Sequence, residues 1–338
     1  RKVVLATNIA ETSLTIEGIR VVIDSGQERA PRFDPISGMT ELKTQVISKA
    51  SAEQRRGRAG RLEPGLCIRL WQESDLNRMA SDSEPEILSA DLSPLALELA
   101  CWGCADPNEL QWLNPPPEKT FAQAIELLQS LQALDQNKQI SPHGKALAQL
   151  PLHPRLAHML LQAKNEQLGG LACTVAALLE ERDLLAGQSR ESDLILRLEA
   201  LSGKRRAPQG RKERLLKSAQ NIGQKLQLKP AFQPQTELAY LLGLAYPERI
   251  AQRRKGKEPR FLLAGGRGAF LDRSDALADA PYLTIAQLDG NPREARIFLA
   301  AALSDQQLER LSKTAQSTKI DVAFNPQTGS VQAREILS

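Results

Sequence analysis

The pattern of apolar and polar positions changes along the chain, and its first part predicts an α/β fold. The runs Lys2–Ala6 and Ile19–Asp24 are short, β-branched and nearly continuous, which is typical of strands in a covered parallel sheet. In the range Gln27–Ser48, two extended stretches flank the turn-rich segment Asp34–Gly38, a pattern that predicts a hairpin. A short helix is expected next, capped by Ser51.

The middle of the chain has helical periodicity. After Pro85, leucines recur at spacings that place them on one helix face: Leu88, Leu92, Leu95 and Leu99. The break Asn114–Pro117 ends this region, and Thr120–Leu134 predicts a further helix whose apolar stripe is Ile125, Leu128 and Leu131. With a short extended stretch near Ile140, these helices suit a winged-helix module.

The last part of the chain changes from helical to β-type. The range Leu156–Leu244 is almost free of strand patterns and rich in Leu, Ala, Gln and Arg, as in a helical bundle. Short β-type segments then alternate with Gly, Asp and Pro, which predicts a small β-barrel: Arg249–Ala251, Arg260–Leu263, Tyr282–Leu288 and Ala295–Ala301. A final helix is predicted near Gln306–Thr314 and assigned to a further module.

Composition bounds the class of protein. The chain has 338 residues, 41% of them hydrophobic and 25% charged, so it is long enough for several domains and is neither disordered nor membrane-spanning in character. Four cysteines in this length do not make a disulfide framework, which favours the cytoplasm. The net charge of +4 permits a polyanionic partner without demanding one. Because the sequence opens without Met on a strand-like run, we expect it to be a piece of a longer protein.

The strongest chemical signal is the basic run Gln54–Arg61, Gln-Arg-Arg-Gly-Arg-Ala-Gly-Arg. On a helix, Gln54, Arg58 and Arg61 are spaced i, i+4 and i+7 and share one face. A guanidinium group matches phosphate oxygens, and an arginine aimed at a transferring phosphoryl group accelerates its transfer about 10³- to 10⁵-fold in other NTPases. The alternative is a basic surface helix that binds nucleic acid or nothing.

A second polar run follows the first predicted strand, in Ala6–Ile16. Ligands of open α/β sheets collect at the carboxyl ends of strands, so its hydroxyl and amide groups are expected where phosphates would lie. Alone, such a run could simply cap a helix. Together with Gln54–Arg61, it closely resembles motifs V and VI of the DEAH-type superfamily 2 helicases, and especially the bacterial HrpB group.

The resemblance covers nearly the whole chain, through Ile87–Leu92, Leu147–Arg155 and Leu241–Ala251. It implies a multidomain α/β plus α fold: the C-terminal half of RecA-like domain 2 in residues 1–72, a winged helix in 73–150, a helical ratchet bundle in 151–240, an OB-like β-barrel in 241–302 and the start of an HrpB-type C-terminal region in 303–338. The predicted hairpin resembles the one that separates strands or steers RNA in this family.

The resemblance also implies roles for individual residues. Gln54, Arg58 and Arg61 would face the γ-phosphate of ATP as the catalytic group, with Arg58 and Arg61 as the arginine-finger candidates. Ser13 would sense the γ-phosphate and the RNA backbone, and Glu17 stands in a nucleotide-contacting position where related helicases usually have Asp. Two further residues, Thr7 and Asn8, would touch RNA phosphates.

The sequence contains neither a GxxxxGK[ST] loop nor an Asp-Glu-x-His run, the motifs that cradle phosphates and hold magnesium. We therefore expect ATP and Mg²⁺ to be bound mainly by another part of the helicase, and this chain alone not to hydrolyse ATP. A non-catalytic nucleic-acid-binding module is the alternative function. RNA is the expected partner, and DNA is a possible one. We expect a monomer that has no metal site and does not bind a membrane. Basic clusters in 204–214 and 253–257 are either RNA contacts or solvated loops.

Overall fold

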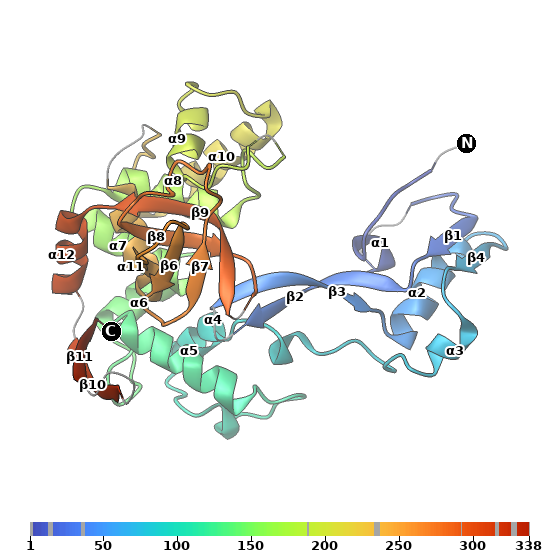
Figure 1. Ribbon diagram of the computed structural model, residues 1–338. Helices are drawn as coiled ribbons and strands as arrows, with labels where there is room; N and C mark the ends of the chain where they lie inside the picture. The colour runs from blue at the N-terminus through green and yellow to red at the C-terminus, as the bar shows by residue number, and fades with distance from the viewer. Residues whose placement is uncertain are drawn as a thin grey trace. The chain divides into compact units, whose positions relative to one another are not determined.

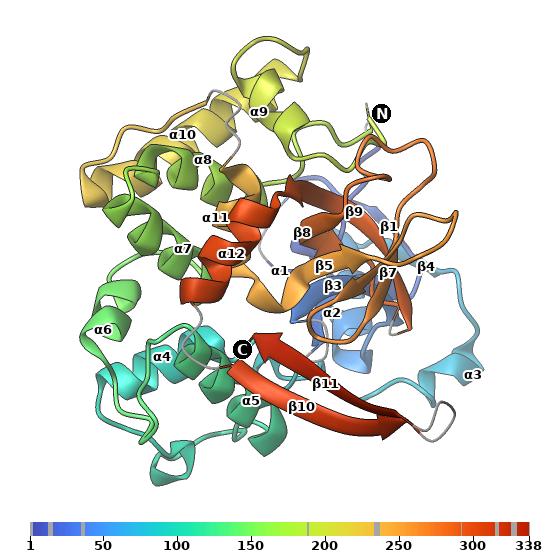
Figure 2. The same ribbon diagram turned by 60° about the vertical axis from the view of Figure 1, so that its left-hand side comes forward.

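A computed structural model describes residues 3–12, 16–34, 38–187, 189–232, 237–291, 293–314, 318–325 and 330–337. The chain forms two compact units, each considered by itself: Arg1–Leu92 with Pro107–Phe121, and Ser93–Asp106 with Ala122–Ser338. Figure 1 and Figure 2 show their elements. Within the described residues, no helix has the length and apolarity needed to cross a membrane.

The first unit is α/β, as predicted. Strands β1 (Val21–Asp24) and β4 (Leu66–Arg69) pair in parallel, while β2 (Gln27–Asp34) and β3 (Met39–Val46) form an antiparallel hairpin. The hairpin prediction is confirmed, although Pro35–Ser37 at its turn lie outside the described residues. The remaining elements are short apart from the second helix: α1 (Ile9–Thr12), α2 (Lys49–Ala59), α3 (Glu73–Leu76), η1 (Glu86–Leu88) and η2 (Pro107–Glu109).

Three predictions for this region are wrong. The run Lys2–Ala6 was predicted as a strand, but Lys2 lies outside the described residues and Val3–Ala6 form no strand. Among the described strands β1 pairs only with β4, so this run has no strand to pair with. Ser51 does not cap the helix, since the Ser48 hydroxyl accepts the Ser51 N–H at 3.0 Å and α2 begins at Lys49. Leu88 and Leu92 are not on the helix that carries Leu95 and Leu99, because that helix begins at Ser93 and only a 3₁₀ turn, Glu86–Leu88, forms shortly before it.

The second unit begins with the winged-helix elements and continues into a helical bundle. Ile125, Leu128 and Leu131 are all buried, as their spacing predicts. An isolated bridge between Leu134 and Ile140 supplies the predicted extended stretch. The helices are α4 (Ser93–Cys101), α5 (Glu118–Ser130, whose first residues belong to the first unit), α6 (Pro142–Ala148), α7 (Pro154–Asn165), α8 (Gly169–Glu180), α9 (Ile195–Leu201), α10 (Gln209–Leu226) and α11 (Leu238–Ala245).

A closed barrel follows the bundle, in the strand order β5-β6-β7-β9-β8. Strand β7 pairs in parallel with β9, and the other neighbours are antiparallel. The sequence pattern predicts all of these strands except the three-residue β7, which is too short to show alternation. Their bounds are β5 (Ile250–Arg253, after the 3₁₀ turn η3, Pro247–Arg249), β6 (Arg260–Leu263), β7 (Gly268–Phe270), β8 (Tyr282–Leu288) and β9 (Glu294–Leu303).

The predicted last helix is α12 (Asp305–Thr314), and it packs on the bundle rather than standing apart. Gly243 of α11 leaves room for Leu311, because an added Cβ would lie 2.4 Å from Leu311 Cδ1. Arg310 stacks on the Tyr240 ring at 3.9 Å and pairs with Glu166 and Glu237. A final antiparallel pair consists of β10 (Thr318–Asn325) and β11 (Ser330–Leu337).

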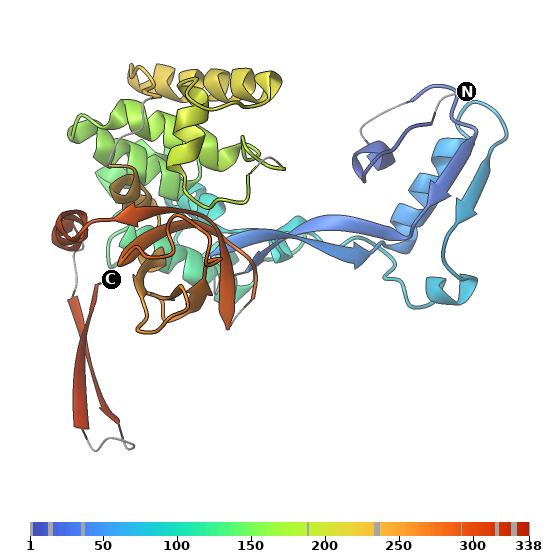
Figure 3. The ribbon, with the colours of Figure 1, turned by 45° about the horizontal axis from the view of Figure 1, so that its top comes forward.

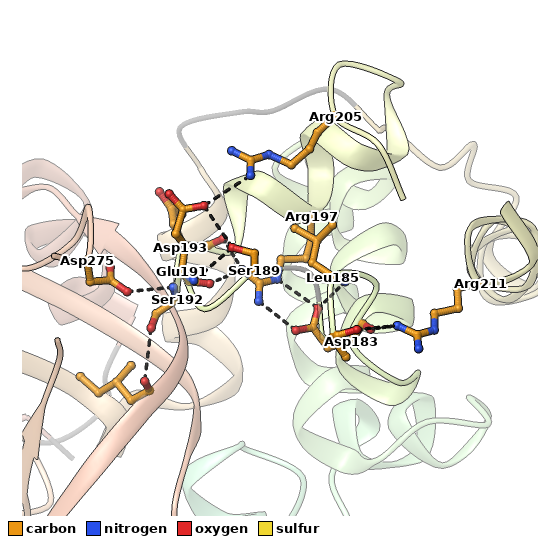
Figure 4. Close-up of polar contacts among 12 residues, drawn as sticks. Asp183, Leu185, Ser189, Glu191, Ser192, Asp193, Arg197, Arg205, Arg211 and Asp275 are labelled. Atoms are coloured by element: carbon orange, nitrogen blue, oxygen red, sulfur yellow. Dashed lines mark hydrogen bonds and ion pairs between the residues drawn. The ribbon is translucent and has the colours of Figure 1, made fainter. Parts of the chain in front are cut away.

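A buried arginine holds the segment that joins the bundle to the barrel (Figure 4). The Arg197 guanidinium donates to both carboxylate oxygens of Asp183, at 3.1 and 2.9 Å, and to the carbonyls of Glu191 and Asp193. On the barrel side, Ser192 N donates to Asp275 Oδ2 at 2.9 Å. The segment after α8 is therefore fixed at both ends by buried polar contacts.

Two histidines meet between α6 and α7. His143 Nε2 and His158 Nδ1 are 2.9 Å apart, with their rings edge to face. Burial, followed by the charge of His143, lowers the pKa of His158 to about 4. Burial also lowers the pKa of His143. The folded state therefore favours neutral imidazoles at this contact.

Replacing Arg197 by Met should destabilise the second unit strongly. The change removes the cation that pairs with the Asp183 carboxylate and donates to two carbonyls, and breaking such a buried pair costs about 3–5 kcal/mol. Arg205→Met, which removes the half-exposed pair with Glu191, is the matched control and should cost about 1 kcal/mol or less. Equal losses for the two variants in urea unfolding would contradict this.

The His158 contact predicts a pH dependence of stability. Because the pKa of His158 is lower in the folded state than its ordinary 6.5, the unfolded state binds the proton more tightly. The free energy of unfolding should thus be unaffected by this group above pH 6.5 and fall between pH 6.5 and about 4, by on the order of 3 kcal/mol. His158→Gln should remove the part of this pH dependence that comes from His158. If the variant keeps the pH profile of the unaltered chain, the His158 contribution is excluded.

Candidate functional site

The basic helix α2 is anchored at its beginning by backbone contacts. The N–H groups of Lys49 and Ala50 donate to the carbonyls of Ala80 and Ser81, at 2.8 and 3.0 Å. These bonds satisfy donors that no residue inside the helix can reach. Ala52, one turn into the helix, is fully buried against a core that includes Ile47 and Met79. The position of the arginines that follow is therefore fixed.

The three side chains predicted to share one face do line one pocket, of about 350 Å³, but not for the predicted reason. Gln54 and Arg58 are one turn apart on α2, whereas Arg61 lies beyond the helix, which ends at Ala59 with Gly60 as its C-cap. The chain turns after the helix and still brings Arg61 to the pocket. Gly57 and Glu11 complete the lining.

Arg58 joins the arginine helix to the polar run that follows the N-terminal segment. Its Nε donates to the Glu11 carbonyl at 2.8 Å, and its Nη2 donates to the same oxygen. Glu11 belongs to α1, whose first turn is closed by its own N–H donating to the Asn8 carbonyl at 2.9 Å. The two sequence motifs thus meet at one backbone oxygen.

Arg55 makes the second connection, which the sequence did not reveal. Its Nε donates to Glu11 Oε2 and its Nη1 to Asp24 Oδ1, both at 3.0 Å, and Nη1 also reaches the Gln27 carbonyl. Burial acts to lower the pKa of Arg55, but the hydrogen bonds with Glu11 and Asp24 outweigh it and raise the pKa. Asp24 is only 2% exposed. In the sequence, Arg55 and Arg56 are adjacent arginines in the basic run. Their spacing does not show that Arg55 binds Glu11 and Asp24 whereas Arg56 pairs with Glu53.

The other predicted site residues are distributed differently. Thr7 and Asn8 are exposed and lie just before α1, a few residues before Glu11, whose carbonyl Arg58 holds. Ser13 lies outside the described residues. Glu17 is exposed in a turn that ends at Gly18, and it is not among the residues that line the pocket.

The charges around the pocket favour an anion. Arg58 and Arg61 bring guanidinium groups to the pocket, and the positive charge of these groups favours phosphate oxygens. Among the described residues that line the pocket, Glu11 is the one acid, and its carboxylate is paired with Arg55, which compensates its negative charge. Gly57 contributes no side chain, and no atom of the described residues lies within 4 Å of where a Cβ on Gly57 would stand. The pocket can therefore accept a terminal phosphate group.

Comparison with known families finds two matches. Residues 1–63 match the helicase conserved C-terminal domain, and residues 124–152 match the winged-helix part of the helicase-associated domain HA2. The first range contains α2 and the pocket, and the second overlaps the C-terminal part of the range predicted as the winged helix.

Individual proteins named as ATP-dependent RNA helicases are similar to this chain. The chain is 44% identical over 322 residues to the ATP-dependent RNA helicase HrpB of Escherichia coli, covering 94% of this chain and 38% of that protein. It is 42% identical over 179 residues to the mouse probable ATP-dependent RNA helicase DHX34, covering 53% of this chain and 16% of that protein. It therefore spans under two fifths of the length of these relatives.

A crystal structure of the E. coli DExH-box NTPase HrpB matches with a TM-score of 0.78 and 40% identity, over 97% of this chain and 39% of that one. A second crystal structure, of the Escherichia coli DEAH/RHA helicase HrpB, matches with a TM-score of 0.79 and 38% identity, over 98% of this chain and 40% of that one. The resemblance found in the two motifs thus extends through the fold, and the chain belongs to the DEAH-type helicases.

Proposed function

We propose that this chain supplies the arginine side of the ATP site and part of the RNA path of a helicase that couples ATP hydrolysis to movement along RNA. The observation that carries the proposal is the gathering of Gln54, Arg58 and Arg61 around one pocket. The names of the matched relatives support ATP and RNA as the ligands. The 3′ to 5′ direction rests on family resemblance alone.

The proposed catalytic roles follow from chemistry. Arg58 and Arg61 stabilise the charge that develops on the γ-phosphate during transfer, and Gln54 orients the phosphate or the attacking water through its amide. Ser13 and Glu17 are proposed to contact the nucleotide. Mg²⁺ and the rest of ATP are assigned to the part of the helicase that carries the phosphate-cradling and acidic motifs, so we do not expect this chain alone to hydrolyse ATP.

Glu11 is proposed as the joint between RNA and ATP. Thr7 and Asn8 offer a hydroxyl and an amide to RNA phosphates a few residues before it. Arg58 holds the Glu11 carbonyl and Arg55 holds its carboxylate. A shift of the RNA-facing segment would therefore move the hydrogen-bond partner of a catalytic arginine, which links RNA binding to the rate of hydrolysis.

The remaining modules are proposed to form the RNA path. We assign residues 1–72 to RecA-like domain 2, 73–150 to the winged helix, 151–240 to a ratchet bundle, 241–302 to an OB-type barrel and 303–338 to an HrpB-type region. The strand order of the barrel, closed by β5 with β8 and by the parallel pair of β7 with β9, supports the OB assignment. We propose a monomer that acts on RNA, and on DNA where it is offered, in the cytoplasm.

Arg58→Ala and Arg61→Ala in the complete helicase should each lower kcat for RNA-stimulated ATP hydrolysis by about 10³-fold or more, because each removes a donor from the transition state. RNA affinity should stay within about twofold, since these side chains face the nucleotide. Steady-state hydrolysis and equilibrium RNA binding measure the two effects separately.

The matched control is Arg56→Ala, which removes an arginine from the same helix. Arg56 pairs with Glu53 at 2.6 Å, is 63% exposed and does not line the pocket, so turnover should be unchanged. Normal turnover in the Arg58 and Arg61 variants with lost RNA binding would instead make both arginines backbone contacts and favour the alternative, a binding module without catalysis.

A further inference from the structure

The β2–β3 hairpin is joined to the arginine helix α2 almost without a connecting loop. Two residues, Ser25 and Gly26, separate β1 from β2, and Ile47 alone separates β3 from Ser48, the N-cap of α2. The backbone closes at this point, since Ile47 N donates to the Gly26 carbonyl at 3.1 Å. Figure 3 shows the hairpin as a long blue ribbon with one end beside α2. Neither connection is long enough to absorb a movement of the hairpin relative to the helix.

The hairpin itself is stiff along its length. Its strands are paired over eight residue pairs, a length of about 27 Å. Side chains also bridge the two strands: Arg32 Nη2 donates to Gln45 Oε1 at 3.2 Å, and Gln45 Nε2 donates to Glu28 Oε1 at 2.9 Å. A displacement applied anywhere on this ribbon is therefore carried to the end where β2 begins and β3 ends.

Gly26 is the tightest point of that end. Its φ is +72°, in the left-handed region that favours glycine. The indole of Trp71 lies against it, because a Cβ on Gly26 would stand 2.5 Å from Trp71 Cδ1 and 2.9 Å from Trp71 Nε1. Trp71 in turn packs on the core that contains Ile47 and Ala52 of the α2 region. The indole thus holds the chain in place where it turns from β1 into β2.

Asp24 ties the same point to the arginine helix. Its Oδ1 accepts the Gly26 N–H and a hydrogen bond from Arg55 Nη1, both at 3.0 Å. The same Nη1 also donates to the Gln27 carbonyl at 3.1 Å, so one guanidinium group holds the chain on both sides of Gly26. Arg55 lies three residues before Arg58 on α2. A shift of the chain at Gly26 would therefore shift the helix that carries Arg58.

We propose that Gly26 and Trp71 are positioning residues that make the hairpin and α2 move as one body, so that a force on the hairpin reaches the phosphate pocket. The inference rests on the proposed function and deepens it, because it names the contact through which hydrolysis is converted into strand separation. The described residues that line the pocket include neither Gly26 nor Trp71. The two residues therefore act on the yield of strand separation per ATP, and hydrolysis itself proceeds without them.

The test measures two rates on the same sample of the complete helicase: ATP hydrolysis, and separation of an RNA duplex with a 3′ single-stranded overhang. Their ratio is the number of duplexes separated per ATP. Gly26→Ala adds a Cβ against Trp71 at a φ that side chains rarely adopt. The matched control is Gly103→Ala, where φ is +84° and no atom of the described residues lies within 4 Å of the new Cβ. Partial unfolding lowers both rates together, so the ratio isolates positioning.

Gly26→Ala should lower the ratio about tenfold or more while RNA-stimulated hydrolysis stays within about threefold, since a misplacement of about 1 Å can cost a positioned group about 10²-fold in rate. The control should keep the ratio within about twofold. A wild-type ratio in a folded Gly26 variant, or an equal fall in the control, would overturn the proposal.

A second variant, Trp71→Leu, tests the same contact without adding a side chain to the turn. It opens the space beside Gly26 and should also lower the ratio. Its control is Leu76→Ala, because Leu76 packs on the same core as Trp71 and its loss weakens that core as well. If Trp71→Leu keeps the wild-type ratio, or Leu76→Ala lowers it equally, the role of Trp71 is rejected.

Hydrogen exchange of the complete helicase tests the rigid connection without any need for activity. Peptides that contain Gly26 and Ile47 should exchange faster in Gly26→Ala than in the unaltered protein, because the bond from Ile47 N to the Gly26 carbonyl is weakened. Unchanged exchange would contradict the proposal. An unaltered helicase that does not hydrolyse ATP with RNA would instead refute the proposed function, and the exchange result would still decide whether Gly26 and Trp71 hold the hairpin to α2.

Discussion

The ion-pair network around Arg55 holds together the parts of the first unit that carry its chemistry. One guanidinium contacts Asp24 at the end of β1, Glu11 in α1 and the Gln27 carbonyl at the start of the hairpin. Removing such a partner would leave Asp24 buried and uncompensated, a costly state. The network also neutralises Glu11, the one acid among the described residues that line the pocket, so the charge around the pocket favours an anion.

The second unit uses buried arginines in a similar way. Arg155 of α7 and Arg249 before β5 lie on the Tyr246 ring, with guanidinium-to-centroid distances of 5.4 and 4.2 Å. Arg155 also donates to the Ala245 carbonyl and pairs with Glu248. Together with Arg197 in the linking segment, these contacts fix the barrel to the bundle.

Local pattern predicted much of the fold, because the hairpin, the helices of the bundle and β6 and β8 each carry their own periodicity. The failures needed information from elsewhere in the chain: the run before Ala6 lacks a partner strand, and Ser48 rather than Ser51 meets the first turn. Spacing identified Arg58 but could not show that Arg61 reaches the pocket from beyond the helix. Nor could it identify Arg55, whose partners are 31 and 44 residues away.

The central claim is that Arg55 and Glu11 link RNA binding to ATP hydrolysis. Its most direct test is the ratio of the ATP hydrolysis rates with and without RNA in the complete helicase carrying Arg55→Lys. Lysine keeps the charge but lacks the fork that reaches Glu11 and Asp24 together. Arg56→Lys is the control. With Arg55 as the positioning residue between RNA and ATP, the ratio should fall toward one in a folded Arg55 variant and stay unchanged in the control. A wild-type ratio in the Arg55 variant would contradict it.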